Sequence, residues 1–482
     1  MPIDQPPRLA DDHHADLAAA TTAWTDQWWD DEVGLLWMPV DPVDGGYPQP
    51  AFHMLPQTAW YAVGLLLRGD DDRAVRALST VLDHQYDEPG NVWHGTYTLV
   101  HEIAHPQPGA RMWDDYDPNW RQFISCTLLL LLRNLGERLP ASLTDRIDTA
   151  LRLAVEGEHA EAGGRRITTS YSNISLMQAY VEVEAGRRLD EREWIAGGED
   201  RARRTVARFD RHGAFDEFNS PTYHGIDLKA LGLWRGHSDS DLLHDLGTRV
   251  EAELWSEAAR WYHAGLRQVA GPYTRAYGMD LGRYVAQWAV WIWAAAGREI
   301  APLPDLGRPL EHSWDLSFGP AAALIGAAVP DDARRDLLEL TGERVVTRRI
   351  SEPDDGDRVA TAWLADDVAF GAESSTVDLS WWEQFHAATA HWRRADGSIG
   401  WLRAIVPGPS DATVEPGRMV LRWHHGADPA PDAVARFELE APLTDADPVT
   451  LTSDGAPLPA GVAPIEARPG PGPVTTFELR RG

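Results

Sequence analysis

Apolar residues recur at three- and four-residue spacing through the first 300 residues of the chain. This spacing places them on one face of a helix and therefore predicts amphipathic or buried helices. Loops rich in Gly, Pro, Asp and Asn separate the segments, which is typical of consecutive helical hairpins. The helices expected on this basis cover residues 9–29, 57–68, 74–86, 120–135, 143–156, 172–185, 191–209, 225–234, 239–265 and 281–296. We therefore predict an N-terminal (α/α) toroid of five to six helical hairpins over residues 1–300.

The pattern changes after a proline-rich stretch at residues 301–310, which we interpret as a linker. The following segments are short, rich in β-branched and aromatic residues, and separated by Asp-Gly, Pro-Gly and Gly-Pro turns. They are residues 344–350, 360–364, 368–372, 398–406, 419–423, 435–439 and 475–479. This pattern predicts a C-terminal antiparallel β-sandwich over residues 311–482. The chain as a whole is expected to be an α+β multidomain protein.

The chain carries a formal net charge of −30 at pH 7. Because no basic stripe is present to neutralise phosphates, nucleic acid and anionic membranes are excluded as partners. The longest apolar run, residues 128–132, is too short to span a bilayer. The first residues show no basic region followed by an apolar run, so we expect a cytoplasmic protein without a secretory signal. The sequence leaves a homo-oligomer open.

Cysteine and lysine each occur only once in the chain, and this excludes several kinds of site and mechanism. Cys126 is the sole cysteine, so neither an intrachain disulfide nor a cysteine cluster for zinc or iron–sulfur can form. Lys229 is the sole lysine and lies in an apolar helical segment, which argues against a Schiff-base mechanism. No phosphate-binding or dinucleotide fingerprint is present, and we expect neither cofactor nor metal. Of the 22 Trp, we expect most to fill the core and a minority to stack on sugar rings.

The most informative stretch brings four kinds of polar chemistry into eight residues. It holds the carboxylate of Glu217, the amide of Asn219, the phenol of Tyr223 and the imidazole of His224, followed at once by an apolar helical pattern. Polar groups at the start of a core helix are a common way to place chemistry at a cavity. Ser220-Pro221 is also a helix-start signal by itself, with Asn219 or Ser220 as N-cap. Capping leaves Glu217, Tyr223 and His224 unexplained, so we favour a functional site.

A second cluster is Trp113-Asp-Asp-Tyr-Asp-Pro-Asn-Trp120, in which Asp114, Asp115 and Asp117 lie between Trp113 and Trp120. Its carboxylates and indoles could bind a sugar, act as acid and base, or hold a divalent cation. The alternative is helix capping by Asp117 with solvated charge around it.

Two further clusters supply an amide and a guanidinium. Asn173 stands among hydroxyl residues at the start of a predicted helix, where it either caps the helix or presents its amide to a cavity. In the segment 270–280, Arg275 lies between Tyr273 and Tyr277 and is followed by Asp280. Arg binds carboxylates in a bidentate manner and favours the ionised form of a nearby phenol. Alternatively, Arg275 pairs with Asp280 inside a loop.

These groups suit proton abstraction next to a uronate carboxylate, followed by loss of the 4-linked oxygen. The reaction requires neutralisation of the carboxylate, a base at C5 and an acid at the leaving oxygen. Asn173 and Arg275 can meet the first requirement. Tyr223, Tyr277 or His224 can meet the others.

The segment Glu217-Phe-Asn-Ser-Pro-Thr-Tyr-His224 resembles the Glu-x-Ser-Pro-x-Tyr-His stretch of heparinase II/III-type and alginate-lyase-type polysaccharide lyases, with one extra residue between Glu and Ser. The predicted toroid and sandwich are similar to those lyases over most of the chain. The resemblance implies that Tyr223 is the catalytic acid or base and that Asn173 neutralises the uronate. These lyases usually have His directly after that Asn, whereas this chain has Ile174.

The first hypothesis is thus a β-elimination lyase acting on a uronate-containing oligo- or polysaccharide. Substrate contacts are expected from Trp113, Asp115, Asp117, Trp120, Tyr273 and Asp280. The alternative is a glycoside hydrolase on the same scaffold, with Asp115 or Asp117 and Glu217 as its two carboxylates. A non-catalytic sugar-binding protein ranks next.

Two other motifs point to metal enzymes and rank last. The stretch Asp114-Asp-Tyr-Asp117 is similar to the aspartate-rich motif of terpene cyclases, but no second magnesium motif accompanies it. His101-Glu-Ile-Ala-His105 has the spacing of a zinc peptidase. Pro106 argues against the helix that a zinc peptidase site requires.

Overall fold

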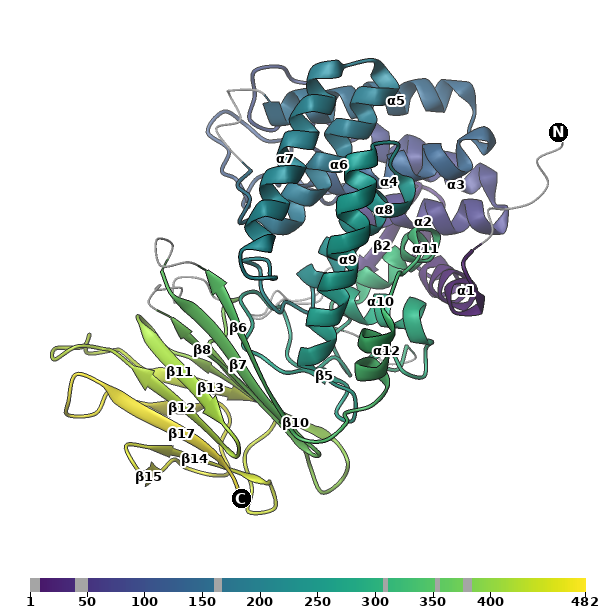
Figure 1. The fold of residues 1–482 in the computed structure, drawn as a ribbon. Helices are drawn as coiled ribbons and strands as arrows, with labels where there is room; N and C mark the ends of the chain where they lie inside the picture. The colour runs from purple at the N-terminus through teal and green to yellow at the C-terminus, as the bar shows by residue number, and fades with distance from the viewer. Residues whose placement is uncertain (1–8, 40–50, 160–166, 307–310, 352–355, 376–383) are drawn as a thin grey trace. The chain divides into compact units, whose positions relative to one another are not determined.

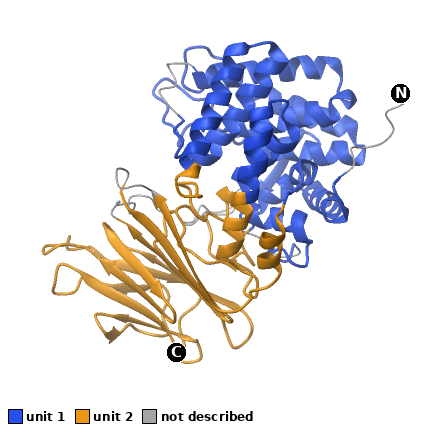
Figure 2. Cartoon of the chain, viewed as in Figure 1, with its two compact units in different colours: residues 1–208, 225–252, 285–328 blue, residues 209–224, 253–284, 329–482 orange. Residues whose placement is uncertain are grey.

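The computed structural model describes residues 9–39, 51–159, 167–306, 311–351, 356–375 and 384–482. The chain divides into two compact units (Figure 2). The first comprises residues 1–208, 225–252 and 285–328, and the second residues 209–224, 253–284 and 329–482. Each unit is described here by itself.

The first unit is built from helices that follow one another as hairpins (Figure 1). The described residues form the α-helices α1 (Asp12–Asp26), α2 (Leu55–Arg68), α3 (Asp71–Leu82), α4 (Trp120–Leu135), α5 (Ala141–His159), α6 (Ser172–Leu189), α7 (Arg192–Asp210), α8 (Tyr223–His237), α9 (Asp241–Trp261), α10 (Gln287–Ala296), α11 (Gly319–Ile325) and α12 (Asp331–Leu338). The predicted helical toroid is confirmed, and the bounds of α4 are those expected from the sequence.

Burial separates inner from outer helices. In α6 every residue from Ser172 to Gly186 is buried, and α2 and α10 are buried almost throughout. The outer helix α3 buries only one face, at Ala74, Ala77, Leu78, Val81 and Leu82. A helix that is buried on all sides lies inside a ring, and one with a single apolar stripe covers it from outside. Helices α1 and α11 contact each other and α2, and both also contact α10, which closes the ring.

The connections between the helices alternate in length. The inner helices α2, α4, α6 and α8 are followed by short links, at residues 69–70, 136–140, 190–191 and 238–240. Long connections precede α2, α4, α6, α8 and α10, at residues 27–54, 83–119, 160–171, 211–222 and 262–286. Helices joined as consecutive hairpins run parallel within the inner ring, so the long connections all lead to the N-terminal ends of inner helices. Long connections in compact domains are often functional.

A small sheet in the connection from α1 to α2 was not predicted. It consists of β1 (Trp29–Asp30), β2 (Leu35–Pro39) and β3 (Ala51–Met54) in sequential antiparallel order. Two of its strands are only two and four residues long, and β2 ends in proline, so the segment shows no clear alternation.

The second unit is the predicted antiparallel sandwich, which is confirmed. Among the described residues, one sheet has the order β16-β13-β10-β9-β8-β7-β6 and the other β11-β12-β17-β14-β15. The strands are β6 (Arg344–Ser351), β7 (Arg358–Ala365), β8 (Val368–Ser375), β9 (Ala388–Arg393), β10 (Ile399–Ile405), β11 (Ser410–Glu415), β12 (Arg418–Trp423), β13 (Ala435–Leu439), β14 (Val449–Ser453), β15 (Ala456–Pro457), β16 (Ile465–Ala467) and β17 (Thr475–Arg481). Alternate residues of both sheets, such as Trp363, Phe370, Trp392 and Phe477, form the apolar core between them.

The chain does not assign its residues to the two units in one continuous order. The first sandwich strand begins at Arg344, because residues 313–338 form a short 3-10 helix, α11 and α12 instead of strands. Residues 209–224 and 253–284, which we expected in the toroid, belong to the compact unit of the sandwich. The domain boundaries at 300 and 311 stay a prediction, and residues 307–310 of the expected linker lie outside the described residues. In the described part of the chain, the helices are all too short or too polar to cross a membrane.

Candidate active site

Tyr223 is delivered by a well-defined helix start. Helix α8 begins at Tyr223, whose backbone N–H donates to Ser220 Oγ over 3.0 Å. The backbone N–H of His224 donates to the carbonyl of Ser220 over 3.0 Å. Ser220 therefore caps the helix, as the Ser-Pro signal indicated. Capping fixes the first turn, and with it the position from which the Tyr223 side chain leaves the helix.

Asn219 locks this segment to a second one. Its φ of 53° lies in the left-handed region, which Asn tolerates better than most residues. Its side-chain Nδ2 donates to the carbonyls of Ala270 and Pro272 over 2.6 and 3.0 Å. The backbone N–H of Thr274 donates to the carbonyl of Phe218 over 3.1 Å. The segments 214–224 and 270–280 therefore hold each other in place.

Tyr223, Tyr277 and Arg275 form the centre of this arrangement. The hydroxyls of Tyr223 and Tyr277 share a short hydrogen bond, and the two rings lie 5.9 Å apart at 54°. The guanidinium carbon of Arg275 lies 3.8 Å from the centroid of the Tyr223 ring. A cation over a tyrosine ring stabilises negative charge on the phenol oxygen more than it stabilises the neutral phenol. The Tyr223 residue is 7% exposed, so water screens this effect little.

Arg275 is held on two sides by acceptors. Its Nη1 lies 3.0 Å from Glu217 Oε1, and its Nε donates to Gln384 Oε1 over 2.7 Å. The Glu217 side chain is 5% exposed, so the ion pair is largely desolvated. The alternative pairing of Arg275 with Asp280 is wrong. Asp280 accepts instead from Gln268 Nε2 over 2.6 Å and from the backbone N–H of Gly282 over 2.8 Å.

His224 and Tyr273 have internal partners that argue against the roles expected for them. Burial lowers the pKa of His224 to about 4, and its Nε2 accepts the backbone N–H of Asn219 over 3.1 Å. A neutral imidazole whose lone pair is already occupied is a poor base at neutral pH. The hydroxyl of Tyr273, which is 1% exposed, donates to the carbonyl of Val269. Burial raises the pKa of Tyr273, so its phenol stays neutral.

The aspartates of the segment 113–120 have local partners within the first unit. Asp115 Oδ2 accepts the backbone N–H of Arg111 over 2.7 Å, and Asp114 pairs with the Arg111 guanidinium at 3.1 Å. Asp117 Oδ1 accepts the backbone N–H of Asn119 over 2.8 Å. These contacts agree with the capping alternative. Within the described ranges, no group of three His, Cys, Asp or Glu side chains could hold a metal ion.

The other expected substrate contacts in the first unit occupy different environments. Trp113 is 57% exposed and has a positive φ of 73°. Trp120 is the first residue of α4 and is partly buried. Asn173 is the second residue of α6 and is fully buried.

The residues of the zinc-peptidase spacing lie in a loop. His101 Nδ1 lies 2.7 Å from His84 Nε2, and Glu102 Oε1 lies 2.6 Å from His53 Nδ1. His105 Nε2 pairs with Glu88 at 2.5 Å. His84 and Glu88 belong to the same long connection as the motif, and His53 belongs to β3, so these contacts hold the loop together and attach it to β3.

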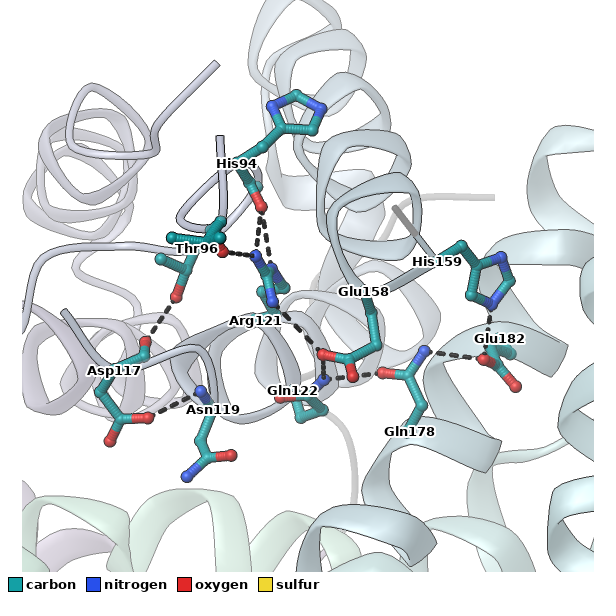
Figure 3. Close-up of polar contacts among 12 residues, drawn as sticks. His94, Thr96, Asp117, Asn119, Arg121, Gln122, Glu158, His159, Gln178 and Glu182 are labelled. Atoms are coloured by element: carbon teal, nitrogen blue, oxygen red, sulfur yellow. Dashed lines mark hydrogen bonds and ion pairs between the residues drawn. The ribbon is translucent and has the colours of Figure 1, made fainter. Parts of the chain in front are cut away.

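A buried polar network of the first unit was not found from the sequence (Figure 3). Arg121 Nε donates to the carbonyl of His94 over 2.9 Å, and its Nη1 lies 3.3 Å from Glu158 Oε2. Gln122 Nε2 donates to Glu158 Oε2 and to Gln178 Oε1 over 3.2 and 2.8 Å. The side chains of Arg121, Glu158 and Gln178 are almost fully buried. The network ties the first turn of α4 to α5, α6 and the loop that carries His94.

The same network continues to a titratable pair. Gln178 Nε2 and His159 Nε2 both donate to Glu182 Oε1, over 2.9 and 2.8 Å (Figure 3). The hydrogen bond to Glu182 raises the pKa of His159 although burial opposes it. Burial of Glu182 favours its neutral form, but the bond from His159 and the charge of Arg201 outweigh this and lower its pKa. Apolar periodicity indicates that these helix positions are buried, but it cannot reveal which polar groups pair there.

Gln384 and His386 were missed as neighbours of the candidate site. Gln384 bonds Arg275, and His386 exchanges two backbone hydrogen bonds with Tyr273, over 3.1 and 2.9 Å. His391 lies further along, in β9. The cluster of aromatic and polar residues before His386 was the signal available for Gln384.

Comparison with known proteins places the chain in a family. The sequence model described as "Domain of unknown function (DUF8769)" matches residues 15–327. The chain belongs to the DUF8769 family. The DUF8769 match includes the segments that carry Tyr223, Arg275 and Tyr277, and its description names no activity. Among curated proteins, none matches this sequence.

Solved structures with a distant likeness to this DUF8769 chain include two of Streptomyces coelicolor A3 chondroitin AC lyase and one of heparinase III. The chondroitin AC lyase structure of a point mutant has 11% sequence identity and a TM-score of 0.37, and the match covers 98% of this chain and 80% of that one. Heparinase III has 8% identity and a TM-score of 0.37, covering 98% and 86%. The chondroitin sulphate complex of the first enzyme has 11% identity and a TM-score of 0.35, covering 98% and 97%. These values are too low to carry an argument, so the site is interpreted from its own geometry.

Proposed function

We propose that this protein is a lyase that cleaves a uronate-containing oligo- or polysaccharide by β-elimination. The observation that carries the proposal is the Tyr223–Tyr277 hydroxyl pair with the Arg275 guanidinium 3.8 Å from the Tyr223 ring centroid. Two phenols in direct contact can divide the work of base and acid, and the cation favours the ionised form of one of them.

The reaction assigns one proton transfer to each tyrosine. The Tyr223 phenolate takes the proton from C5 of the uronate. The electrons of the C5–H bond form the C4=C5 double bond while the C4–O bond breaks. Tyr277 gives its proton to the departing oxygen. The hydrogen bond between the two hydroxyls then returns a proton from Tyr223 to Tyr277, which restores the starting state.

The substrate carboxylate has to be neutralised while negative charge develops on C5. Arg275 is paired with Glu217 and Gln384, so we assign it to Tyr223 and not to the substrate. The amide of Asn173, in the first turn of α6, is our proposed donor to the carboxylate. A helix N-terminus also favours anions. Trp113 and Trp120 remain proposed stacking residues for the sugar chain, and imported oligosaccharides in the cytoplasm remain the proposed substrate source.

No observation favours the glycoside hydrolase alternative. A hydrolase acid must reach the glycosidic oxygen, but Glu217 Oε1 is ion-paired with Arg275 Nη1 at 3.0 Å and the Glu217 side chain is only 5% exposed. Asp115 and Asp117 each accept a nearby backbone N–H, so both carboxylates already make local structural contacts.

The test compares Tyr223→Phe and Tyr277→Phe with the wild type on uronate oligosaccharides. Each substitution should lower kcat by about 10²- to 10⁴-fold, because it removes one proton-transfer group. Tyr180→Phe is the matched control. This buried tyrosine of α6 donates to the carbonyl of His237 over 3.1 Å, and its loss should leave kcat unchanged.

A substrate with an aryloxide leaving group separates the two roles. Aryloxide departs without protonation, so the activity of Tyr277→Phe should recover on this substrate, whereas Tyr223→Phe should stay impaired. Full turnover by Tyr223→Phe on both substrates would refute the assignment. Binding without turnover by the wild type would point to a sugar-binding protein.

A further inference from the structure

The sheet β16-β13-β10-β9-β8-β7-β6 has two chemically different faces. One face contributes Trp363, Phe370, Ala390 and Leu402 to the apolar core of the sandwich. Side chains alternate along a strand, so the intervening residues point to the opposite face. In β7, β8 and β9 these include Ala362, Gly371 and Thr389, which lie side by side in register. Small side chains in adjacent strands allow another backbone segment to approach this second face closely.

The segment 270–280, which carries Arg275 and Tyr277, packs against this second face. A Cβ atom added to Gly371 would lie 1.8 Å from the carbonyl oxygen of Gly271. A Cβ atom added to Gly271 would lie 2.0 Å from Thr389 Oγ1. Neither position has room for a methyl group. At Gly371 the neighbouring atom belongs to the backbone of Gly271, which cannot rotate away as a side chain can. The backbone N–H of Ala276 also donates to the carbonyl of Gln384 over 3.0 Å. The segment is thus seated directly on the sheet.

A buried ion pair fixes the middle of the seated segment. Arg358 of β7 pairs with Glu373 of β8 through Nε–Oε1 and Nη2–Oε2 distances of 2.7 and 3.1 Å. The same Nη2 donates to Thr274 Oγ1 over 2.8 Å. The side chains of Arg358 and Glu373 are 8% and 0% exposed. Thr274 directly precedes Arg275, so this bond holds the residue next to the guanidinium that lies over Tyr223.

A pair of this kind has a high desolvation cost and contributes little net stability. Apolar residues of similar volume can replace buried ion pairs without loss of stability in other proteins. What an apolar pair cannot supply is a directed donor for Thr274. The additional hydrogen bond from Arg358 Nη2 to Thr274 Oγ1 therefore indicates what the buried charge does, because it holds the segment in one position.

We propose that Arg358, paired with Glu373, is a positioning residue for the segment that carries Arg275 and Tyr277. On this proposal, the sandwich sheet belongs to the catalytic apparatus, because it sets the distance between the Arg275 guanidinium and the Tyr223 ring. The effect on turnover rests on the lyase function proposed above. The effect on the position of the segment does not.

The test removes the Thr274 acceptor without disturbing the ion pair. Thr274→Val is nearly isosteric, Thr274→Ser restores the hydroxyl, and Thr475→Val is the matched control. Thr475 is a fully buried threonine of β17 whose Oγ1 accepts the backbone N–H of Gly470 over 2.7 Å. Gly371→Ala is a second variant, which acts on the same segment because the added Cβ would meet the carbonyl of Gly271.

Two measurements are made on each variant, and one of them needs no activity. Amide hydrogen exchange of residues 270–280 should become about tenfold faster in Thr274→Val, because a bond to a charged donor is lost. Exchange in Thr274→Ser and Thr475→Val should match the wild type in this segment. With a uronate oligosaccharide, Thr274→Val and Gly371→Ala should lower kcat by about 10- to 100-fold with little change in KM, because sub-ångström misplacement affects the chemical step.

The outcomes separate the two proposals. Unchanged exchange in Thr274→Val would overturn the positioning role, whether or not the protein is a lyase. Faster exchange with unchanged kcat would overturn the link from position to catalysis. Faster exchange in a protein whose wild type shows no elimination would support the positioning role and refute the lyase function alone.

Discussion

Lys229 offers the sharpest test of how the first unit is packed. This lysine of α8 is 1% exposed, and its ammonium lies 5.0 to 5.5 Å from the rings of Phe123, Trp60 and Phe318. Its Nζ donates to the carbonyl of Phe123 over 3.4 Å. Burial lowers the pKa of Lys229 from 10.5 to about 8, although Cys126 and Asp315 act in the opposite direction. The cost of placing a charge inside the ring of inner helices is therefore measurable.

The size and the pH range of this cost follow from the two pKa values. Each pH unit between them corresponds to about 1.4 kcal/mol, so the charged amine costs about 3 kcal/mol at pH 7. The unfolded chain binds the proton more tightly than the folded chain. Stability should therefore rise with pH between about 8 and 10.5, and the full penalty should apply below pH 8. The three aromatic rings stabilise the charged amine by about 1 to 2 kcal/mol, and Lys229→Met removes this cation–π stabilisation.

We expect Lys229→Met to be more stable than the wild type by about 1 to 3 kcal/mol at pH 7. The gap should close as the pH approaches 10.5, because the buried amine of the folded wild type is then neutral and the unfolded amine has begun to lose its proton. The assay is urea unfolding of both proteins at pH 7 and pH 10.5, with helicity as the signal of the first unit. Other groups titrate equally in both proteins and cancel in the difference. A difference that is independent of pH, or a variant that is less stable at pH 7, would refute the buried position of the amine.

Three further predictions concern the partners of single side chains. Arg275→Met leaves the buried Glu217 carboxylate without its guanidinium and should lower the free energy of unfolding by about 3 to 5 kcal/mol. The double variant with Glu217→Gln should recover part of this lost stability. A smaller loss in Arg275→Met would contradict a desolvated ion pair. Asn219→Ala should lower the free energy of unfolding by about 2 to 4 kcal/mol, because it removes two hydrogen bonds and the residue that tolerates a φ of 53°. Asn219→Gly should lower it by about 1 kcal/mol less, because glycine tolerates this φ. Equal unfolding midpoints of the two variants would disprove the backbone contribution. Glu182 raises the pKa of His159 in the folded state. The stabilisation from this pair is therefore fully present below pH 6.5 and is lost as the pH rises through the higher pKa of the folded state. The thermal unfolding temperature should show this pH dependence in the wild type and not in His159→Gln.

Local patterns predicted much of the fold. The apolar periodicity of 120–135 gave the bounds of α4, and the Ser-Pro signal indicated Ser220 as a cap of α8, which begins at Tyr223, two residues before the predicted start. The turn-bounded apolar segments gave β7, β8, β10 and β13 of the sandwich. These features depend on interactions within a few residues, which is why a single sequence contains them.

The missing features depend on contacts between distant segments. Glu217 and Arg275 are 58 residues apart, and Arg358 and Thr274 are 84 apart. No local spacing indicates such pairs, so the sequence suggested Asp280 as the partner of Arg275. The domain boundaries at 300 and 311 stay a prediction; the compact unit that contains the sandwich strands also includes residues 209–224 and 253–284. Strand β9 was not predicted, because five of its six residues are buried and the alternation of exposed and buried positions is absent.

The chemistry of the side chains was enough to select the candidate residues from the sequence. It was not enough to say which of them could act as a base. The sequence singled out Glu217, Tyr223, Arg275 and Tyr277, and the structure brings these four side chains together. It treated His224 as a base, although burial and the Asn219 N–H make it a poor one. Burial and hydrogen-bond direction decide such roles, and neither can be read from residue type.

The most direct test of the lyase function incubates the wild-type protein with uronate oligosaccharides and neutral glycans. It follows the ultraviolet absorbance of an unsaturated uronate together with newly formed reducing ends. Elimination creates a C4=C5 double bond conjugated with the carboxylate, so we predict that absorbance and reducing ends rise together, and only with uronate substrates. New reducing ends without absorbance would contradict the account, because they would show that the glycosidic bond is hydrolysed and not eliminated.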